Sequence, residues 1–196
     1  PSVTSILSAT QPKEKRESLE NWRKNVGENK AASITKLSTD IGTLAHTHIQ
    51  SLIIGESGLT GNHPMRVQAR TMGDSHYLHQ WLPNVSDCYG IETDLYCDGL
   101  YAGATDAIVK YQGELAIYDI KTSRKTRSDD HISDYYLQIA GYCIALESLT
   151  GVEVNHGVIA LTSHQCVNQT WLMSGELMQE SKRKWIERVE QYYSMH

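Results

Sequence analysis

The feature that most constrains this chain is a pair of strand-like segments joined by a two-residue turn. Residues 101–111 (YAGATDAIVKY) and 114–122 (ELAIYDIKT) are short and rich in β-branched and aromatic side chains, which is typical of β-strands. Gln112 and Gly113 between them suit a tight hairpin. We therefore expect two neighbouring antiparallel strands, and the hairpin brings together the charged residues that they carry.

These charged residues are Asp106 in the first strand and Asp119 and Lys121 in the second. Because side chains alternate along a strand, Asp119 and Lys121 point to the same side. The hairpin places Asp106 beside Asp119, and two converging carboxylates attract a hard cation such as Mg²⁺ or Mn²⁺. A lysine next to them can orient a metal-bound water and help to deprotonate it. The pattern therefore predicts phosphodiester hydrolysis, although an Asp-x-Lys alone is more often a surface ion pair.

The segments around this hairpin predict an α/β protein. Apolar periodicity, capping residues and strand-rich runs place the remaining elements as helices over 11–30, 38–55, 64–82, about 132–149 and from 175 to the end, with strands over 92–98, 155–163 and 169–174. Helices, three strands, a helix, two strands and a helix in this order form a central mixed sheet flanked by helices.

Composition narrows the function without deciding it. The chain has 196 residues, enough for one domain, and a formal net charge of −5, which argues against coating nucleic acid by bulk electrostatics. An enzyme that uses metal ions to neutralise acidic ligands remains compatible with this charge. Four widely spaced cysteines without a Cys-x-x-Cys pair predict a reduced, intracellular protein rather than a disulfide framework or a zinc site.

The sequence shows no secretory signal and no apolar run of about eighteen residues, so no contact with a membrane is expected. We expect a cytoplasmic protein of a bacterium or of a phage-infected cell. A mitochondrial location is the alternative if a transit peptide has been removed.

Four short motifs extend the Asp/Asp-x-Lys pattern. In chain order they read GTLAH, GATD, DIK and QIAGY, at Gly42–His46, Gly103–Asp106, Asp119–Lys121 and Gln138–Tyr142. Together they resemble the RecB-type branch of the PD-(D/E)XK nucleases, whose signature is GxxxH, GxxD, DxK and QxxxY. The N-terminal PSVTSIL and the charged segment with ENWRK are similar to the exonucleases that maintain the mitochondrial genome and to their phage and bacterial relatives.

The resemblance implies a restriction-endonuclease-like core with an N-terminal helical extension. The extension would cover residues 1–37 and the core residues 38–196, with a helical insertion at about 60–85. It also implies a metal site, whose ligands would be His46, Asp106, Asp119 and the carbonyl of Ile120. Lys121 would position the attacking water, and Glu92 on the preceding strand would support the site.

Several of these residues have simpler readings. His46 could be a packed histidine, but Gly42 four residues earlier matches the motif, whereas His48 points away from His46 on a helix. Glu92 could be a solvated acid at the start of a strand. The resemblance also implies substrate contacts from Gln138 and Tyr142, which share one helical face and could instead be plain hydrogen-bonding residues.

Basic residues predict where DNA would run. Residues just past the Asp-x-Lys strand could hold the phosphate backbone, and a further arginine could add a second contact: Ser123, Arg124, Lys125, Arg127 and Arg70. The alternative is a solvated charged loop. Trp22 could stack on a base, but its spacing with Leu19 and Val26 favours a core position.

We therefore predict a Mg²⁺- or Mn²⁺-dependent DNA exonuclease that acts on single-stranded ends in replication, recombination or repair. The expected partner is single-stranded DNA, with a single-strand-annealing or recombination protein as a second candidate. Alternatives are an exonuclease that resects duplex ends, a structure-specific endonuclease of the same fold, and a scaffold with a relic site. No acidic position of the four motifs has been replaced, which argues against the relic.

Overall fold

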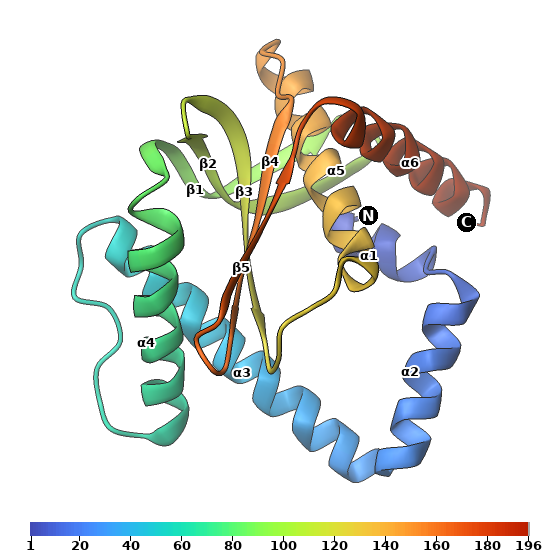
Figure 1. Cartoon of the computed structure of the whole chain (residues 1–196). Helices are drawn as coiled ribbons and strands as arrows, with labels where there is room; N and C mark the ends of the chain where they lie inside the picture. The colour runs from blue at the N-terminus through green and yellow to red at the C-terminus, as the bar shows by residue number, and fades with distance from the viewer. Residues whose placement is uncertain (196) are drawn as a thin grey trace.

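The computed structural model describes residues 1–195 (Figure 1). Its elements in chain order are α1 (Val3–Ala9), α2 (Lys13–Val26), α3 (Glu28–Ile53), α4 (Pro64–His76), the π-helix η1 (Tyr77–Trp81), β1 (Val85–Cys97), β2 (Tyr101–Tyr111), β3 (Glu114–Ser123), the 3-10 helix η2 (Asp129–His131), α5 (Ser133–Thr150), β4 (His156–Ser163), β5 (Asn168–Met173) and α6 (Gly175–Ser194).

The five strands form one mixed sheet in the order β1-β2-β3-β4-β5. The pairs β1–β2, β2–β3 and β4–β5 are antiparallel, whereas β3 and β4 are parallel and are joined through α5. Gln112 and Gly113 have φ values of 49° and 96°. Two positive φ values at the centre of a two-residue turn are typical of a type I′ hairpin, so the predicted hairpin and the predicted fold class are confirmed.

Helices cover both faces of the sheet, with α1, α5 and α6 on one side and α3 and α4 on the other (Figure 1). Because side chains alternate along β3, its residues pack into two hydrophobic cores, one on each face of the sheet. Ile117 packs toward Ile139 of α5, whereas Tyr118 and Ile120 pack toward Ile49 of α3. All five side chains are buried, so burial on both faces fixes the register of β3.

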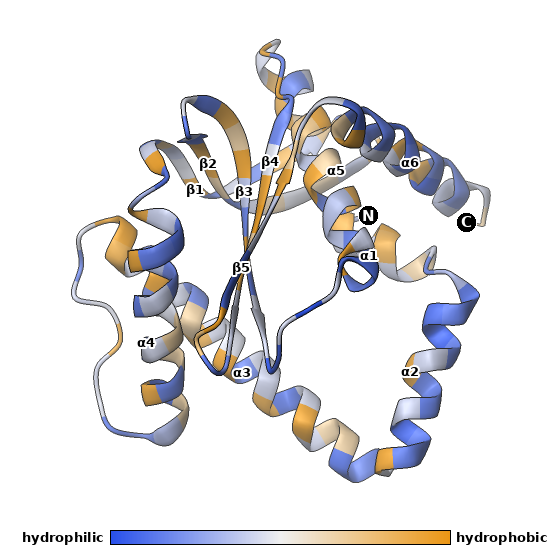
Figure 2. Cartoon of the chain, in the orientation of Figure 1, coloured by the Kyte–Doolittle hydropathy of each residue, from blue (hydrophilic) through white to orange (hydrophobic). Residues whose placement is uncertain are grey.

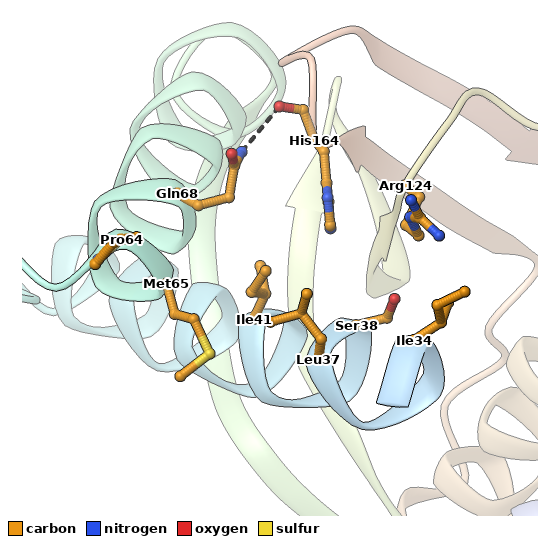
Figure 3. Close-up of a pocket in the computed structure, with 9 residues that line it drawn as sticks. All are labelled: Ile34, Leu37, Ser38, Ile41, Pro64, Met65, Gln68, Arg124 and His164. Atoms are coloured by element: carbon orange, nitrogen blue, oxygen red, sulfur yellow. Dashed lines mark hydrogen bonds between the residues drawn. The ribbon is translucent and has the colours of Figure 1, made fainter. Parts of the chain in front are cut away.

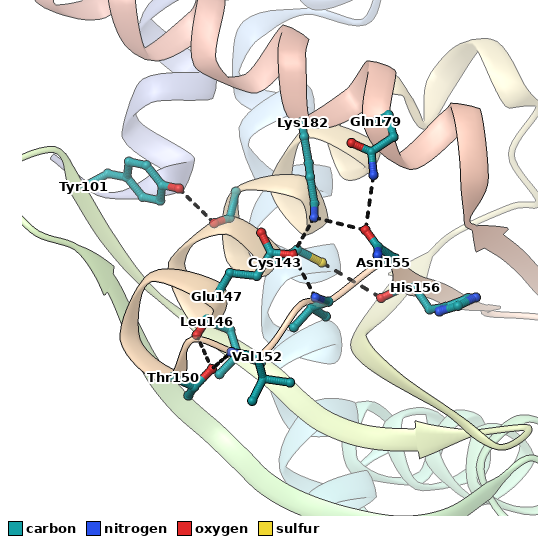
Figure 4. A network of polar contacts seen from close by, with 12 residues as sticks. Tyr101, Cys143, Leu146, Glu147, Thr150, Val152, Asn155, His156, Gln179 and Lys182 are labelled. Carbon is teal, nitrogen blue, oxygen red and sulfur yellow. Dashed lines mark hydrogen bonds and ion pairs between the residues drawn. The ribbon is translucent and has the colours of Figure 1, made fainter.

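A polar network fixes α5 against α6 and the start of β4 (Figure 4). The Nζ of Lys182 lies 2.6 Å from Oε1 of Glu147, and the same carboxylate oxygen accepts a hydrogen bond of 2.7 Å from the backbone N–H of Val154. The Glu147 carboxylate on α5 thus contacts both α6 and the segment that precedes β4. These contacts hold α5 in one position over the sheet.

The start predicted for the helix at 38–55 is wrong. The structure has one helix, α3, from Glu28 to Ile53, and the break lies at Gly27, whose φ of 89° is outside the helical region. Thr39 and Asp40 are good capping residues, but neither glycine nor proline precedes them within α3 to stop the helix. The division into residues 1–37 and 38–196 remains a prediction, and the helix runs through it.

The exposed helix α2 also differs from the expectation. It has no buried residue, so Trp22 is not part of the core. Figure 1 shows α2 standing away from the sheet, and Figure 2 shows that most of its residues are hydrophilic. The short helix α1 was not predicted, although it buries Val3, Ile6 and Leu7. No helix within residues 1–195 combines the length and the apolar character needed to span a bilayer.

Candidate metal centre

The candidate site lies where β2 and β3 separate. Their pairing ends at Ala107 and Tyr118, whereas β2 stays paired with β1 and β3 stays paired with β4 beyond that point. Asp106 is the next residue along β2, and its Oδ2 accepts a hydrogen bond of 2.6 Å from the backbone N–H of Ile120. The carboxylate therefore takes the place of a ladder partner and is fixed between the two diverging strands.

Three side chains from three elements converge there. His46 reaches from α3, and its Nδ1 lies 3.3 Å from Oδ1 of Asp106. Glu92 lies opposite Asp106, between two paired positions of the β1–β2 ladder. One ligand atom from each of these three residues lies within 4.8 Å of the other two. The cluster therefore offers two carboxylates and one imidazole to a single small ion.

The backbone of Glu92 is unusual for a side chain of its size. Its φ is 47°, in the left-handed region that non-glycine residues seldom adopt. Such strain costs on the order of 1–3 kcal/mol and persists where the surroundings hold it. Gln50, one turn after His46 on α3, donates a hydrogen bond from Nε2 to Oε1 of Glu92. This contact aims an exposed carboxylate at the cluster.

Asp119 and Lys121 form an ion pair beside the cluster, with Asp119 buried and Lys121 partly buried. Asp119 is only 2% exposed, and the Nζ of Lys121 lies 2.6 Å from its Oδ2. The same ammonium lies 4.9 Å from the centre of the Tyr135 ring on α5. Burial raises the pKa of Asp119 to about 6, Lys121 opposes the rise and Asp106 adds to it. Burial lowers the pKa of Lys121, but Asp119 and Asp106 outweigh it and raise this pKa above its usual value.

The charges of His46 and Asp106 support each other. Burial pushes the pKa of Asp106 upward, but the hydrogen bond and charge of His46 outweigh this effect, and the pKa is lowered. Burial pushes the pKa of His46 downward, and Asp106 reverses this, so the imidazolium is favoured. The position next to Asp106 therefore stabilises positive charge, and a metal ion there would displace the imidazole proton.

The donor set fits a hard divalent cation. Carboxylate oxygens and one imidazole nitrogen, without a thiolate, suit Mg²⁺ or Mn²⁺ better than a soft metal. The structure groups Glu92 with His46 and Asp106, whereas Asp119 faces Lys121. The ligand roles of Asp119 and of the Ile120 carbonyl, and the supporting role of Glu92, remain predictions.

The two histidines of α3 diverge as expected from their spacing. His48 is buried, with Nε2 at 2.8 Å from Oδ1 of Asp74 and with Nδ1 accepting a hydrogen bond of 2.9 Å from the N–H of Leu59.

Gly42, one turn before His46, explains how α3 approaches the sheet. A Cβ at Gly42 would lie 2.8 Å from Oγ1 of Thr122, so a larger residue would push the helix away.

The glycine of GATD and the QxxxY motif meet on the other side of the sheet. Tyr142 is buried, and a Cβ at Gly103 would lie 3.0 Å from its Cε1. The Nε2 of Gln138 donates a hydrogen bond of 3.3 Å to the Tyr142 hydroxyl. Burial raises the pKa of Tyr142, and Asp119 contributes to the rise. The pair thus lies close to the charged cluster, and its contact with substrate remains a prediction.

Three predicted basic contacts lie together in the exposed loop after β3. Arg124, Lys125 and Arg127 are all exposed. Arg127 donates a hydrogen bond of 3.1 Å from Nε to Oγ of Ser123, and its backbone exchanges hydrogen bonds of 2.8 and 2.9 Å with the Gln169 side chain. These contacts anchor the end of the loop and leave Arg124 and Lys125 directed to solvent.

Arg70 lies apart from this loop. Its Nη1 donates to the carbonyls of Leu59 and Gly61 at 3.4 and 3.2 Å. These bonds hold the segment between α3 and α4, which also receives the contact from His48. Binding of DNA by Arg70 remains a prediction, and holding this segment is its observed contact.

Sequence reasoning missed a buried polar network beneath the site. Nε2 of His76 lies 3.0 Å from the Tyr118 hydroxyl, and Nδ1 lies 3.2 Å from Oγ1 of Thr162 and 3.1 Å from Nε2 of Gln80. Burial lowers the pKa of His76 to about 3, so its imidazole is neutral. The network fixes Tyr118, the residue before Asp119. The spacing of His76 and Gln80, four residues apart in the helix predicted over 64–82, was its only sequence signal.

The chain is similar in sequence to known exonucleases. The chain is 28% identical over 203 residues to mitochondrial genome maintenance exonuclease 1 of Mus musculus and 25% identical over 201 residues to that of Homo sapiens. Each match covers 98% of this chain but 58% of the relative, so the chain spans little more than half of their length. These matches confirm the resemblance predicted from the motifs.

A solved structure from Eubacterium rectale, provisionally described as an exonuclease, has a TM-score of 0.58 at 13% sequence identity. The matched region covers 81% of this chain and 65% of the Eubacterium rectale chain. At this level of identity the match supports the fold. No protein-family profile matches the chain.

Proposed function

We propose that this chain is a divalent-metal-dependent DNA exonuclease. The observation that carries the proposal is the convergence of His46, Glu92 and Asp106 beside the ion pair of Asp119 and Lys121. The similarity to mitochondrial genome maintenance exonuclease 1 supports the same activity class. Because the chain spans 58% of the mouse and human relatives, their activity is carried over here only as part of the proposal.

The proposed metal is Mg²⁺ or Mn²⁺, held by His46 and Asp106 with further oxygen ligands from Asp119, the Ile120 carbonyl or Glu92. When bound, such an ion neutralises charge on the scissile phosphate and lowers the pKa of the attacking water. Gln50 keeps the Glu92 carboxylate in place. The hydrogen bond from the Ile120 N–H keeps Asp106 in place.

Asp119 and Lys121 divide the proton chemistry. The raised pKa of Lys121 keeps its ammonium protonated, so it donates hydrogen bonds to the attacking water and to a phosphate oxygen. A protonated lysine cannot accept the proton of the water. Asp119, whose pKa is raised to about 6 in the metal-free protein, is ionised at neutral pH and is the adjacent carboxylate that we propose accepts it. Lys121 then orients the water, and Asp119 receives the proton.

The proposed substrate is a single-stranded DNA end. A net charge of −5 with one short basic loop provides few phosphate contacts, which suits a single strand better than a long duplex. Arg124, Lys125 and Arg127 would hold the backbone directly after the strand that carries Lys121. A role in replication, recombination or repair, with a strand-annealing or recombination protein as a partner, belongs to the same proposal.

The decisive experiment uses four DNA substrates of one sequence: linear single strand, closed circular single strand, blunt duplex and duplex with single-stranded tails. Each is incubated with Mg²⁺, Mn²⁺ or EDTA, with the Asp119→Asn variant as the matched control. We expect metal-dependent loss of the linear single strand and of the tails, and intact circles. Cleavage of the circles would identify an endonuclease, and preference for blunt duplex would identify a duplex-resecting exonuclease. Undiminished cleavage in EDTA would refute the metal mechanism.

A further inference from the structure

A cavity of about 310 Å³ lies between α3, α4 and the ends of β3 and β4 (Figure 3). Its volume is at the small end of ligand pockets, which span roughly 300–1,000 Å³. The side chains that matter here are Ile34, Leu37 and Ile41 on α3, Met65 on α4, Arg124 and His164. The cavity thus combines an apolar floor with one cationic and one aromatic side chain at its rim.

The floor is apolar and accessible. Ile41 is buried in the small core between α3 and α4, whereas Leu37, one turn earlier, is 47% exposed. Figure 3 shows both side chains pointing up into the cavity, with Met65 at one side. A flat apolar ligand placed there would cover Leu37 and gain the free energy of that burial.

His164 is held in place by its backbone rather than by its ring. Its N–H donates a hydrogen bond of 2.9 Å to the Ser123 carbonyl, and its carbonyl accepts one of 2.8 Å from Nε2 of Gln68. Figure 3 shows the imidazole ring directed toward Ile41 and Leu37. Burial and the nearby Arg124 lower the pKa of His164, so the ring is neutral and offers a flat face for stacking.

Arg124 supplies the charge at the rim. It is exposed, and no ion pair joins it to an acid within residues 1–195. Asp40, the acid within residues 34–41 of α3, is paired with Lys36 at 2.8 Å. Lys125 follows in the same loop. The rim therefore favours an anionic group next to the apolar floor.

The cavity and the candidate metal centre lie near each other along α3 and at the end of β3. Ile41 precedes His46 by five residues, or about 7.5 Å along the axis of α3, and Arg124 follows Lys121 by three residues. Between the two sites α3 approaches β3 so closely that a Cβ at Gly42 would lie 2.8 Å from Oγ1 of Thr122. A polymer with alternating flat rings and phosphates can reach both places with neighbouring units.

We propose that this cavity binds one base of the DNA strand whose scissile phosphate lies at the metal centre. The base packs between the apolar floor and the His164 ring, and the adjoining phosphate contacts Arg124. This inference rests on the proposed nuclease function. Stacking of a base on an aromatic ring tolerates any sequence, which suits an enzyme that degrades whatever strand it meets.

The test separates base contacts from backbone contacts. Binding is measured by fluorescence anisotropy in EDTA, using a labelled oligodeoxythymidylate and the same sugar-phosphate backbone without bases. For the intact protein we expect the base-bearing strand to bind about tenfold more tightly, the size expected for one stacked base. His164→Ala should reduce this ratio to near one by weakening only the base-bearing strand. His164→Phe should restore it, because phenylalanine keeps the ring.

Two matched variants complete the design. Arg124→Ala should weaken both strands equally, whereas Gln165→Ala, at the exposed neighbour of His164, should leave both affinities unchanged. If His164→Ala keeps the wild-type ratio while the protein still degrades DNA, the base site is refuted and the nuclease proposal stands. If the wild type neither binds nor degrades DNA, both proposals fail. A concentration-dependent dimer that Leu37→Ser abolishes, with no base effect, would assign the cavity to a contact between copies.

Discussion

Replacing Asp119 with asparagine should stabilise the metal-free protein while abolishing nuclease activity. The Asp119 side chain is 2% exposed, and burial raises its pKa to about 6 although Lys121 lies 2.6 Å away. The ionised carboxylate therefore costs free energy in the folded state. Asparagine keeps the size of the side chain and removes the charge. The folded state is therefore stabilised, and the site loses a proton acceptor.

The magnitude follows from the pKa difference. An aspartate in an unfolded chain has a pKa of about 3.9, and each pKa unit corresponds to about 1.4 kcal/mol. A folded-state pKa of about 6 for Asp119 therefore costs up to about 3 kcal/mol at neutral pH. For a chain of this length, about 2–4 °C of melting temperature accompanies each kcal/mol, so we expect the variant to melt up to about 6–12 °C higher.

The advantage of the variant should depend on pH. Since the folded pKa of Asp119 lies above its unfolded value, the folded wild type loses stability as pH rises from about 4 to 6 and stays constant above. The depressed pKa of His76 acts in the opposite direction, because the unfolded chain binds its proton between about pH 3 and 6.5. His76 is present in both proteins, so its contribution cancels in the difference.

Urea unfolding in EDTA at pH 4.5 and pH 7.5 measures this difference, and Asp106→Asn is the matched control. The pKa of Asp106 is lowered, so its ionised form stabilises the fold and its replacement should destabilise. Added Mn²⁺ should stabilise the wild type more than either variant. An Asp119→Asn protein that is less stable than wild type by the same amount at both pH values would refute the argument from burial.

Four further predictions concern catalysis and substrate. Lys121→Met should lower the single-turnover rate constant by at least about a hundredfold while DNA affinity changes little, because a preorganised hydrogen-bond donor is lost; a near wild-type rate would remove Lys121 from the mechanism. Adding Lys121→Met to the Asp119→Asn variant should cost little more, because residues that act as a unit are not additive. Neutralising Arg124, Lys125 and Arg127 together should flatten the slope of log affinity against log salt by up to about 2, with kcat at saturating DNA less affected. Calcium should support little cleavage of the linear single strand, because its looser coordination positions water poorly; rates equal to those with Mg²⁺ would contradict this reading.

The sequence alone determined most of the secondary structure and part of the site. The spacing of apolar and β-branched residues located the sheet strands, and Gln112-Gly113 fixed the hairpin, because two positive φ values are needed there. A two-residue turn sets the register of the two strands it joins. Asp106 and Asp119 were therefore predictable as neighbours, and the Asp-x-Lys spacing put Lys121 beside them.

Helix boundaries were less predictable from local signals. Asp40 and its neighbours could have capped a helix, but α3 continues through them from Glu28. A capping residue favours a helix start only when the chain before it leaves the helix, and Gly27 was the residue that did so. The outcome depended on competition between two starts, which the pattern of capping residues did not resolve.

Only the tertiary structure decided which charged groups meet. Glu92 joins His46 and Asp106 because the β1–β2 ladder sets it opposite Asp106 with a left-handed backbone. His76 lies under the site because α4 packs on β4, more than eighty residues later in the chain. Local periodicity sets which face of an element is apolar, but contacts between distant elements depend on how strands diverge and helices pack, and no local pattern encodes those distances.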